Sequence, residues 1–376
     1  MRTALRMLEN PLDQQVYIDY GLELHNQGRS DKAAKCYEKA TQTFPNHAGR
    51  FVLPLALDLL HCGDWDNAWK IMGTPGLLSR RLGKNLYEEI TNVCCKKPWS
   101  GGETKGPLLI VGEQGLGDNI QSMRFILDIK LKNIDSIYLT RKELVPLIQE
   151  GSEITNVCSG VKNLPKETQW VPIMNLIPMF WKQEEKAKHA TEYLDIREER
   201  VKKWEYLLRK EPKKALIALH WQGNPEHEKN SFYAKGRSMM FKEFTKLGGK
   251  ENVEFVSIQK GSGSEQFKAD TNLQFVKGQD KVSKSMDLRD TGAVLRNCEL
   301  LITCDSAVAH LAGAMGVTCW LLLSYIPDWR WEKKGCRTQW YESIRVFRQK
   351  REGAWSEVMK SVNSELIKWL KENHTV

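Results

Sequence analysis

The strongest constraint on the fold is an alternation of short apolar runs with helical patterns, which begins near residue 108 and starts again near residue 215. Runs of this length are typical of buried strands, and helices between successive strands make the strands parallel. Two such series predict an α/β fold with two doubly wound halves, and ligands bind such sheets at the carboxyl ends of the strands. The expected strands are 108–112, 137–139, 154–158 and 171–174, followed by 216–220, 253–258, 273–276, 300–303, 318–322 and 344–347.

The first part of the chain repeats itself. Residues 14–81 show self-similarity at a period of about 35 residues, and Gly21, Ala33 and Pro45 stand where the tetratricopeptide pattern of two antiparallel helices places small and helix-ending residues. Two copies are fewer than the roughly three that stand alone. We therefore expect an all-α arm that packs on the next domain and either binds a partner or acceptor or serves as a structural cap.

Amphipathic stretches between the apolar runs predict the helices that cover the sheets. The expected helices are 196–209, 241–247, 288–297, 307–315 and a long final helix at 355–371. A polar segment rich in Gly, Pro and Lys, which ends near residue 107, is typical of a linker. The predicted parts are a helical arm at 1–97, lobes at 107–212 and 213–350, and a C-terminal helix at 351–376.

Composition narrows the class of ligand. The formal net charge of +9 is spread along the chain, which suits an anionic ligand, and no nucleic-acid-binding motif accompanies it. No apolar run is long enough to span a bilayer and the N-terminus lacks a secretory signal, so we expect a cytoplasmic protein with at most peripheral membrane contact and no nucleic acid as partner. The nine cysteines show no paired spacing, which favours reduced thiols over a metal site.

The strongest local signal is a buried strand, a turn and a helix of small residues at 300–316. The strand ends at Asp305, and Ser306 is a good N-cap for the helix. Free backbone N–H groups and the positive end of the helix dipole make such a helix start a site for phosphate. His310 lies one turn further along the same face, where it can bind the same anion. The alternative is an ordinary strand-to-helix turn with a capping serine.

Two further loops follow predicted strands. The first, at 113–118, lacks the third glycine of a dinucleotide-binding motif and ends in Asp118, which is a candidate helix cap. The second begins with His220 and Trp221, after the first strand of the second half. These two residues are either contacts for a sugar or base or strand-end residues of the core.

Together these motifs resemble one known family. The run from Asp305 to Ala314 is similar to the Asp-Thr-Gly/Ala-x-x-His-x-Ala motif of the heptosyltransferase-like glycosyltransferases of family 9. The resemblance implies a GT-B-like pair of Rossmann-like lobes, with the acceptor bound by the first lobe and the nucleotide sugar by the second. It covers roughly 107–350 by motif order, and its further pieces are Asp328-Trp329-Arg330-Trp331, Trp340-Tyr341 and Arg348-Gln349, which recur in repeat-bearing bacterial members.

The resemblance also implies roles for individual residues. Asp118 stands where the family has the carboxylate that acts as general base, Arg237 where a cation contacts the phosphates, and Gln259 where a polar residue contacts the ribose. The other residues implied to bind the nucleotide diphosphate are Lys260, Asp305, Ser306, Ala307 and His310, while Gly117, His220, Trp221 and Asp328 are candidates for contact with the sugar or base.

The function implied is a metal-independent, inverting transfer of a sugar from a nucleotide diphosphate donor to an acceptor hydroxyl. No cofactor is expected beyond the donor as co-substrate, because Asp64-Trp65-Asp66, an Asp-x-Asp pattern, lies in the repeat and not in a loop. The donor's base and sugar stay open, as does a glycan, lipid-linked or protein acceptor. Two alternatives are a non-catalytic nucleotide-binding scaffold and a nucleotide-sugar epimerase of the same fold. The segment 107–212 is short for a GT-B lobe, so part of the usual acceptor-binding structure is either missing or replaced by the arm.

Overall fold

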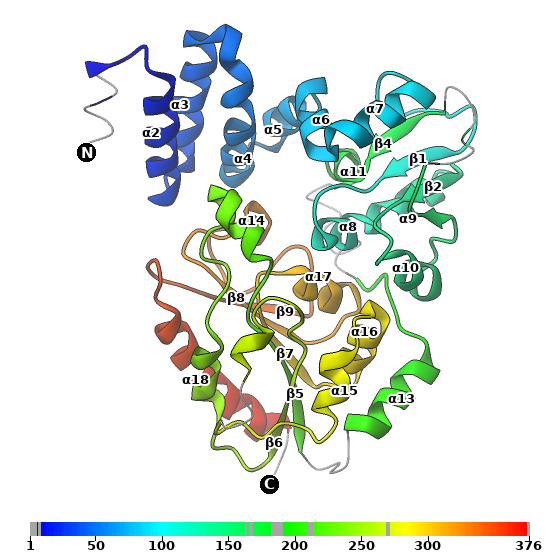
Figure 1. Ribbon diagram of the computed structural model, residues 1–376, viewed down its shortest axis with the longest axis vertical. Helices are drawn as coiled ribbons and strands as arrows, with labels where there is room; N and C mark the ends of the chain where they lie inside the picture. Colours follow the sequence, from blue (N-terminus) through cyan, green and yellow to red (C-terminus); the bar gives the residue numbers. More distant parts are fainter. Residues whose placement is uncertain are drawn as a thin grey trace.

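The computed structural model shows a helical arm, a first lobe and a second lobe (Figure 1). In the figure, the arm and the first lobe lie side by side above the second lobe. The boundary predicted at 212–213, the last residue of the helix predicted at 196–209 and the end of the part predicted at 351–376 lie outside the described residues. The described residues are 6, 9–161, 164, 168–181, 191–208, 214–267 and 271–373.

The second lobe is built on a five-stranded parallel sheet with the strand order β6-β5-β7-β8-β9. Every residue of β5, β7 and β8 is buried, as expected for a parallel sheet that helices cover on both faces. The strands are β5 (Ala215–His220), β6 (Val253–Ser257), β7 (Leu300–Cys304), β8 (Cys319–Leu323) and β9 (Ile344–Arg348). The helices are α14 (Pro225–Asn230), α15 (Gln279–Lys284), α16 (Leu288–Arg296), α17 (Ala307–Ala314) and α18 (Trp355–Asn373), with 3₁₀ helices η4 (Phe232–Ala234), η5 (Phe241–Leu247), η6 (Ser264–Gln266) and η7 (Trp329–Trp331).

One predicted strand of the second lobe is wrong. The run 273–276 contributes only a single bridge, in which Phe275 pairs with Phe255 of β6. The chain leaves the sheet immediately afterwards, because Gly278 begins the turn into α15. The run is therefore apolar because it is packed against the sheet, and it is too short to extend it.

The first lobe is built on a four-stranded parallel sheet with the order β3-β2-β1-β4. The strand expected at 154–158 shortens to two residues at the edge of this sheet. The strands are β1 (Leu108–Val111), β2 (Ser136–Leu139), β3 (Val157–Cys158) and β4 (Trp170–Pro172). The helices are α8 (Leu116–Ser122), α9 (Arg124–Leu131), α10 (Val145–Gly151), η2 (Ile173–Asn175) and α11 (Leu176–Phe180). α13 (Glu198–Leu208) lies in the range predicted for the first lobe but packs on α16 of the second lobe (Figure 1). The expected α/β fold class, two lobes with parallel sheets behind a helical region, is confirmed.

In the arm, each of the helices α2 (Gln14–Asn26) to α4 (Val52–Cys62) packs against the next helix along the chain. Gly21 allows a close approach, since a Cβ at this position would lie 2.4 Å from the ring of Tyr37 on the next helix. The assignment of these helices to the tetratricopeptide pattern stays a prediction. No described helix is both long and apolar enough to cross a membrane. The helices of the arm are α2 (Gln14–Asn26), α3 (Ser30–Thr43), η1 (Pro45–Arg50), α4 (Val52–Cys62) and α5 (Trp65–Met72).

Two helices inside the range predicted as the arm pack on the first sheet instead. α6 (Pro75–Leu82) and α7 (Lys84–Val93) share a hydrophobic cluster with β1, and buried Leu78, Ile90 and Leu109 belong to it. These helices supply a cover for one face of the first sheet, although they precede the linker in the sequence. The short segment at 107–212 is therefore completed by chain that comes before it.

A buried ion pair joins α6 to the end of β1. The guanidinium of Arg81 donates to both carboxylate oxygens of Glu113, at 2.7 and 2.6 Å, and a third N–H donates to the carbonyl of Met72 at 2.9 Å. Glu113 also accepts a hydrogen bond from the backbone N–H of Met174. The side chains of Arg81 and Glu113 are 3% and 0% exposed, so both charges depend on these partners.

One hydrophobic cluster runs through all three parts, and it includes Trp69 of the arm, Phe125 of the first lobe and Leu301 of the second lobe. At the joint, Trp65 of α5 stacks on Trp340 of the second lobe, with ring centres 6.0 Å apart and an angle of 7° between the planes. The arm thus packs on both lobes. The opposite face of the second sheet is covered by α18, whose buried residues form a separate cluster with β5.

Replacing Arg81 with alanine is expected to lower the free energy of unfolding by about 3–5 kcal/mol, because the carboxylate of Glu113 would stay buried without its charged partner. Urea denaturation measures this difference. Lys84→Ala is the matched control, since the ion pair of Lys84 with Glu88 is exposed and such pairs contribute about 0–1 kcal/mol. Equal unfolding free energies for the two variants would contradict the role given to the buried pair.

Candidate functional site

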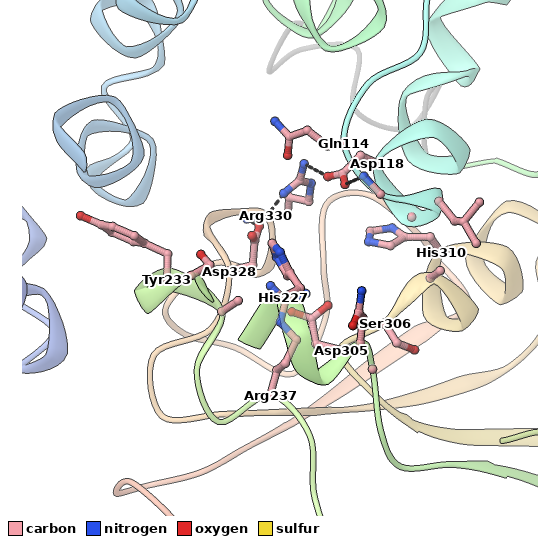
Figure 2. A pocket seen from close by; sticks show the side chains of 18 of the residues that line it. Gln114, Asp118, His227, Tyr233, Arg237, Asp305, Ser306, His310, Asp328 and Arg330 are labelled. Carbon is pink, nitrogen blue, oxygen red and sulfur yellow. Dashed lines mark hydrogen bonds and ion pairs between the residues drawn. The ribbon is translucent and has the colours of Figure 1, made fainter. Parts of the chain in front are cut away.

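A cavity of about 970 Å³ lies where the three parts of the chain meet. Its wall includes side chains of α4 from the arm, of α6 and the start of α8 from the first lobe, and of the start of α17 from the second lobe. Figure 2 shows the polar side chains that converge on it. Of the residues predicted for the site, the wall contains Gly117, Asp118, His220, Arg237, Lys260, Asp305, Ser306, Ala307, His310 and Asp328.

The start of α17 forms one side of this cavity. The hydroxyl of Ser306 does not cap the helix, and its Oγ lies 3.3 Å from Nδ1 of His220. His310 stacks on Trp331, and its Nδ1 lies 2.9 Å from the hydroxyl of Tyr341. Figure 2 shows the ring of His310 directed into the cavity. The first N–H groups of a helix have no partner within the helix, so this side of the cavity can bind an anion.

Both histidines of this region are neutral at pH 7. Burial lowers the pKa of His220 to about 4. Burial, with a further contribution from Arg330, lowers the pKa of His310 to about 3. Any positive charge on this side of the cavity must therefore come from arginine or lysine.

Arg330 joins carboxylates from the two lobes. Its Nη2 donates to Oδ1 of Asp118 at 2.5 Å, and its Nη1 donates to Oδ1 of Asp328 at 2.8 Å (Figure 2). Its Nε donates to Oε1 of Gln121 at 2.6 Å. Arg330 is only 5% exposed, so this guanidinium is a buried cation shared by a first-lobe and a second-lobe acid.

Arg237 is a further cation of the second lobe on the cavity wall. Its Nε is buried and has no hydrogen-bond partner among the described residues. Burial would lower the pKa of Arg237, but Asp305 and then Asp328 raise it above its ordinary value, so the group stays charged. Burial raises the pKa of Asp305, and Arg237 opposes this effect. Burial would also raise the pKa of Asp328, but Arg330 and Arg237 hold it at about 2.

Lys260 lies on the wall, but its ammonium group is turned toward a neighbouring carbonyl. Its Nζ donates to the backbone oxygen of Val282 on α15. Burial lowers the pKa of Lys260 to about 8. Lys260 is therefore a weaker source of positive charge than Arg237. Within the described part of the chain, no group of three or more His, Cys, Asp or Glu side chains is arranged to hold a metal ion.

Two residues predicted to contact the ligand, Trp221 and Gln259, do not line the cavity. Trp221 is fully buried and packs on Phe241, with ring centres 4.7 Å apart. Oε1 of Gln259 accepts from the backbone N–H groups of Trp221 and Gln222, at 3.1 and 3.0 Å. Its Nε2 donates to the carbonyls of Gln222 and Ser262, at 3.0 and 2.7 Å. Gln259 thus connects two loops of the second lobe and has no hydrogen-bonding group left over.

Arg330, His227 and Tyr233 are among the wall residues to which the sequence analysis gave no role. Arg330 carried a signal, because a cation enclosed by tryptophans in Asp328-Trp329-Arg330-Trp331 is unusual for a surface loop. Tyr233 carried none, since its hydrogen-bond partner Asp58 is 175 residues away in the sequence.

The two lobes touch at Gly117. Helix α8 packs against α17 across the lobe boundary. A Cβ at Gly117 would lie 2.8 Å from Cδ2 of His310 and 3.3 Å from Cα of Ala307, and only glycine fits such a contact without a shift. The helix start that carries Asp118 therefore lies directly against the helix start that follows Ser306.

No protein-family profile matches the sequence. Protein FlbA of Caulobacter vibrioides is 23% identical over 295 residues, which are 71% of this chain, and the chain spans about half (48%) of the length of that relative. Among solved structures, the ADP-heptose LPS heptosyltransferase II of E. coli is 11% identical with a TM-score of 0.46, covering 72% of this chain and 100% of that one. A family 9 glycosyltransferase from Veillonella parvula is 13% identical with a TM-score of 0.46, covering 72% and 98%.

Gly117→Ala is expected to push the two helix starts apart and to lower the free energy of unfolding by about 1–3 kcal/mol, the usual cost of overpacking. Urea denaturation measures the loss. Gly76→Ala is the matched control, because a Cβ at Gly76 meets nothing within 4 Å. If both variants are as stable as the unchanged protein, the lobes are not in contact at Gly117.

His220 is expected to make stability depend on pH. Its pKa is about 4 in the folded protein, below the 6.5 of an unperturbed histidine, so the unfolded chain binds the proton first as the pH falls. The contribution of His220 to the free energy of unfolding is complete above pH 6.5 and is lost as the pH falls toward 4. Between pH 7 and pH 5 the free energy of unfolding is expected to fall by about 2 kcal/mol through this histidine.

The measurement is the unfolding free energy at these two pH values. In His220→Asn the amide oxygen replaces Nδ1 without titrating, so the difference between pH 7 and pH 5 shrinks by the amount given above. His47→Asn, at an exposed position, leaves the difference unchanged. The same pH dependence in all three proteins would contradict a buried, neutral His220.

Proposed function

We propose that the chain is a glycosyltransferase that moves a sugar from a nucleoside diphosphate donor to an acceptor hydroxyl without a metal ion. One observation carries this proposal. An anion site of the second lobe, made by the start of α17, His310 and Arg237, opens into the same cavity as a carboxylate of the first lobe, Asp118. Transfer of a sugar from a nucleoside diphosphate needs both of these, a site for the diphosphate and a base for the acceptor hydroxyl.

The diphosphate is proposed to bind at the start of α17, where backbone N–H groups and the helix dipole favour negative charge. The phenol of Tyr341, whose pKa burial raises well above 10, lies 2.9 Å from Nδ1 of His310 and is proposed to donate to it. Because His310 is neutral, its proton is then on Nε2, where it can be donated to a phosphate oxygen. Arg237 adds the positive charge, and its fork of N–H groups matches phosphate geometry.

Charge grows on the diphosphate as its bond to the anomeric carbon breaks. Arg237 is proposed to stabilise this charge, with Arg330 as a second cation on the same wall. Both guanidinium groups are in place before the ligand arrives, so little reorganisation is needed at the moment of reaction. This supports a reaction in which side chains take the part that a divalent ion has in metal-dependent transferases.

Asp118 is proposed to be the general base. Its Oδ2 accepts from the backbone N–H of Gly115 at 2.9 Å and its Oδ1 from Arg330, so the carboxylate has a fixed orientation. It takes the proton of the acceptor hydroxyl while the hydroxyl oxygen forms the new bond to the anomeric carbon. The bond to the diphosphate breaks at the same time, and attack from the opposite face inverts the anomeric configuration.

The arm is proposed to contact the acceptor. Leu53 and Leu57 of α4 line the same cavity as the start of α8, so a molecule whose hydroxyl reaches Asp118 meets the arm as well. This contact supports a role of the helical repeat in binding a glycan, lipid-linked or protein acceptor.

The donor is identified first, by a thermal-shift screen of ADP, GDP, UDP and their sugar conjugates. A ligand at about 100 times its Kd stabilises the native state by about 2.7 kcal/mol, which is easily detected. The absence of a shift with every nucleotide, at millimolar concentration, would refute the proposed function.

With that nucleotide, Asp118→Asn is expected to lower kcat by about 10²–10⁴-fold, the usual contribution of a general base, and to leave the Kd for the nucleoside diphosphate nearly unchanged. Arg237→Ala is expected to weaken this Kd by about 10-fold or more, because it removes a charged hydrogen bond. Calorimetry and single-turnover assays separate binding from turnover.

Asp66→Asn is the control, since Asp66 is exposed on α5 and belongs to the Asp-x-Asp pattern of the repeat. Unchanged turnover in Asp118→Asn would exclude Asp118 as the base. A product in which the sugar is epimerised, formed without an acceptor, would favour the epimerase alternative.

A further inference from the structure

The loop between β5 and η5 carries Arg237 and is fastened at its base. The backbone N–H of Met239 donates to the carbonyl of Trp221 at 2.9 Å, which closes the loop. The backbone N–H of Gly223 donates to Oγ of Ser238 at 2.9 Å. Arg237 immediately precedes this fastening, and the cavity-lining residues His227, Ser231, Tyr233 and Ala234 lie between the two ends.

The tip of the same loop is held by the arm. Tyr233 donates from its hydroxyl to Oδ2 of Asp58 on α4 at 2.9 Å, and its ring centre lies 4.3 Å from that of His25 on α2. Figure 2 shows Tyr233 directed away from Arg330, toward the helices of the arm. The loop that bears Arg237 is therefore anchored at two places, one in its own lobe and one in the arm.

The carboxylate of Asp58 is buried in the arm and is hydrogen-bonded on both of its oxygens. It is 0% exposed, and its Oδ1 accepts from Nδ1 of His25 at 2.7 Å. A buried carboxylate needs donors on both oxygens, and Tyr233 is the donor on the second oxygen. Burial raises the pKa of Tyr233 well above 10, so its hydroxyl keeps its proton and stays a donor at neutral pH. The contact is thus complete only when the loop is in this position.

The arm also holds the other cavity loop of the second lobe. Trp65 and Trp69 of α5 contact Trp329 edge to face, with ring centres 5.5 and 6.2 Å apart. Trp329 begins η7 and stands between Asp328 and Arg330. Arg237 and Arg330 are therefore both carried by loops that pack on the arm.

We propose that the inner face of the arm, through Asp58 and its hydrogen bond to Tyr233, positions Arg237 for a nucleoside diphosphate. The arm would then act on donor binding in addition to the acceptor contact proposed above. This inference rests on the proposed function for its ligand, while the contact between arm and loop can be tested without any ligand. Asp58 and Tyr233 are positioning residues, since they act on the ligand through Arg237.

The test uses Tyr233→Phe, which removes only the hydroxyl, and Asp58→Asn, which changes the same contact from the other side. Hydrogen exchange of the amides of residues 222–238 is expected to be about tenfold faster in both variants, the factor that corresponds to one lost hydrogen bond, with β7 unchanged. The exposed Tyr206, changed to phenylalanine, is the matched control and leaves the exchange of the loop as it was.

The second readout is binding of the nucleotide found in the screen of ADP, GDP and UDP. Its Kd is expected to rise about three- to tenfold in both variants, and KM for the donor with it, while kcat changes less than twofold. A Kd equal to that of the unchanged protein, or unchanged exchange at 222–238, overturns the proposal. If the unchanged protein binds none of the three nucleotides, the proposed function and the positioning role toward Arg237 both fail, and exchange then reports on the contact alone.

Discussion

The arrangement of the site depends on one buried cation that two lobes share. Arg330 belongs to the second lobe, yet it binds a carboxylate on each side of the boundary, Asp118 and Asp328. A buried guanidinium is costly to leave unpaired, so this ion pair keeps the start of α8 close to η7. Since Asp118 is also the proposed base, the carboxylate that joins the lobes is the same group that is proposed to take the acceptor's proton.

The charges around the cavity are already balanced by one another. Asp118, Asp305 and Asp328 surround Arg237 and Arg330, and the shifted pKa values of Asp305 and Asp328 follow from these neighbours. A diphosphate at the proposed site would therefore exchange partners with these carboxylates, and it would not simply fill a positive pocket. Such an exchange favours a ligand whose charge and geometry match the arginines better than a carboxylate does.

The sequence predicted what is encoded locally. β7 and α17 lie in one continuous segment, so their order and the position of Asp305 between them could be seen directly. Gln259 shows a limit, because a polar residue after a strand looks the same whether it faces a ligand or the backbone N–H groups of the next loop. The strand predicted at 273–276 does not form, because the chain turns into α15 at Gly278 before the segment can pair further with β6. The hydrogen bond of Tyr233 to Asp58 joins parts of the fold that no local pattern connects.

The hydrophobic cluster that passes through the arm and both lobes limits how the arm can be gained or lost in evolution. A relative that lacked α4 to α7 would expose the face of β1 around Leu109 and the rings of Trp329 and Trp340, which is a large apolar patch in water. Gain or loss of the arm during evolution would therefore require compensating substitutions at these positions, or another segment in its place. Where the arm is present, its sequence and that of the lobes are expected to co-vary at this joint.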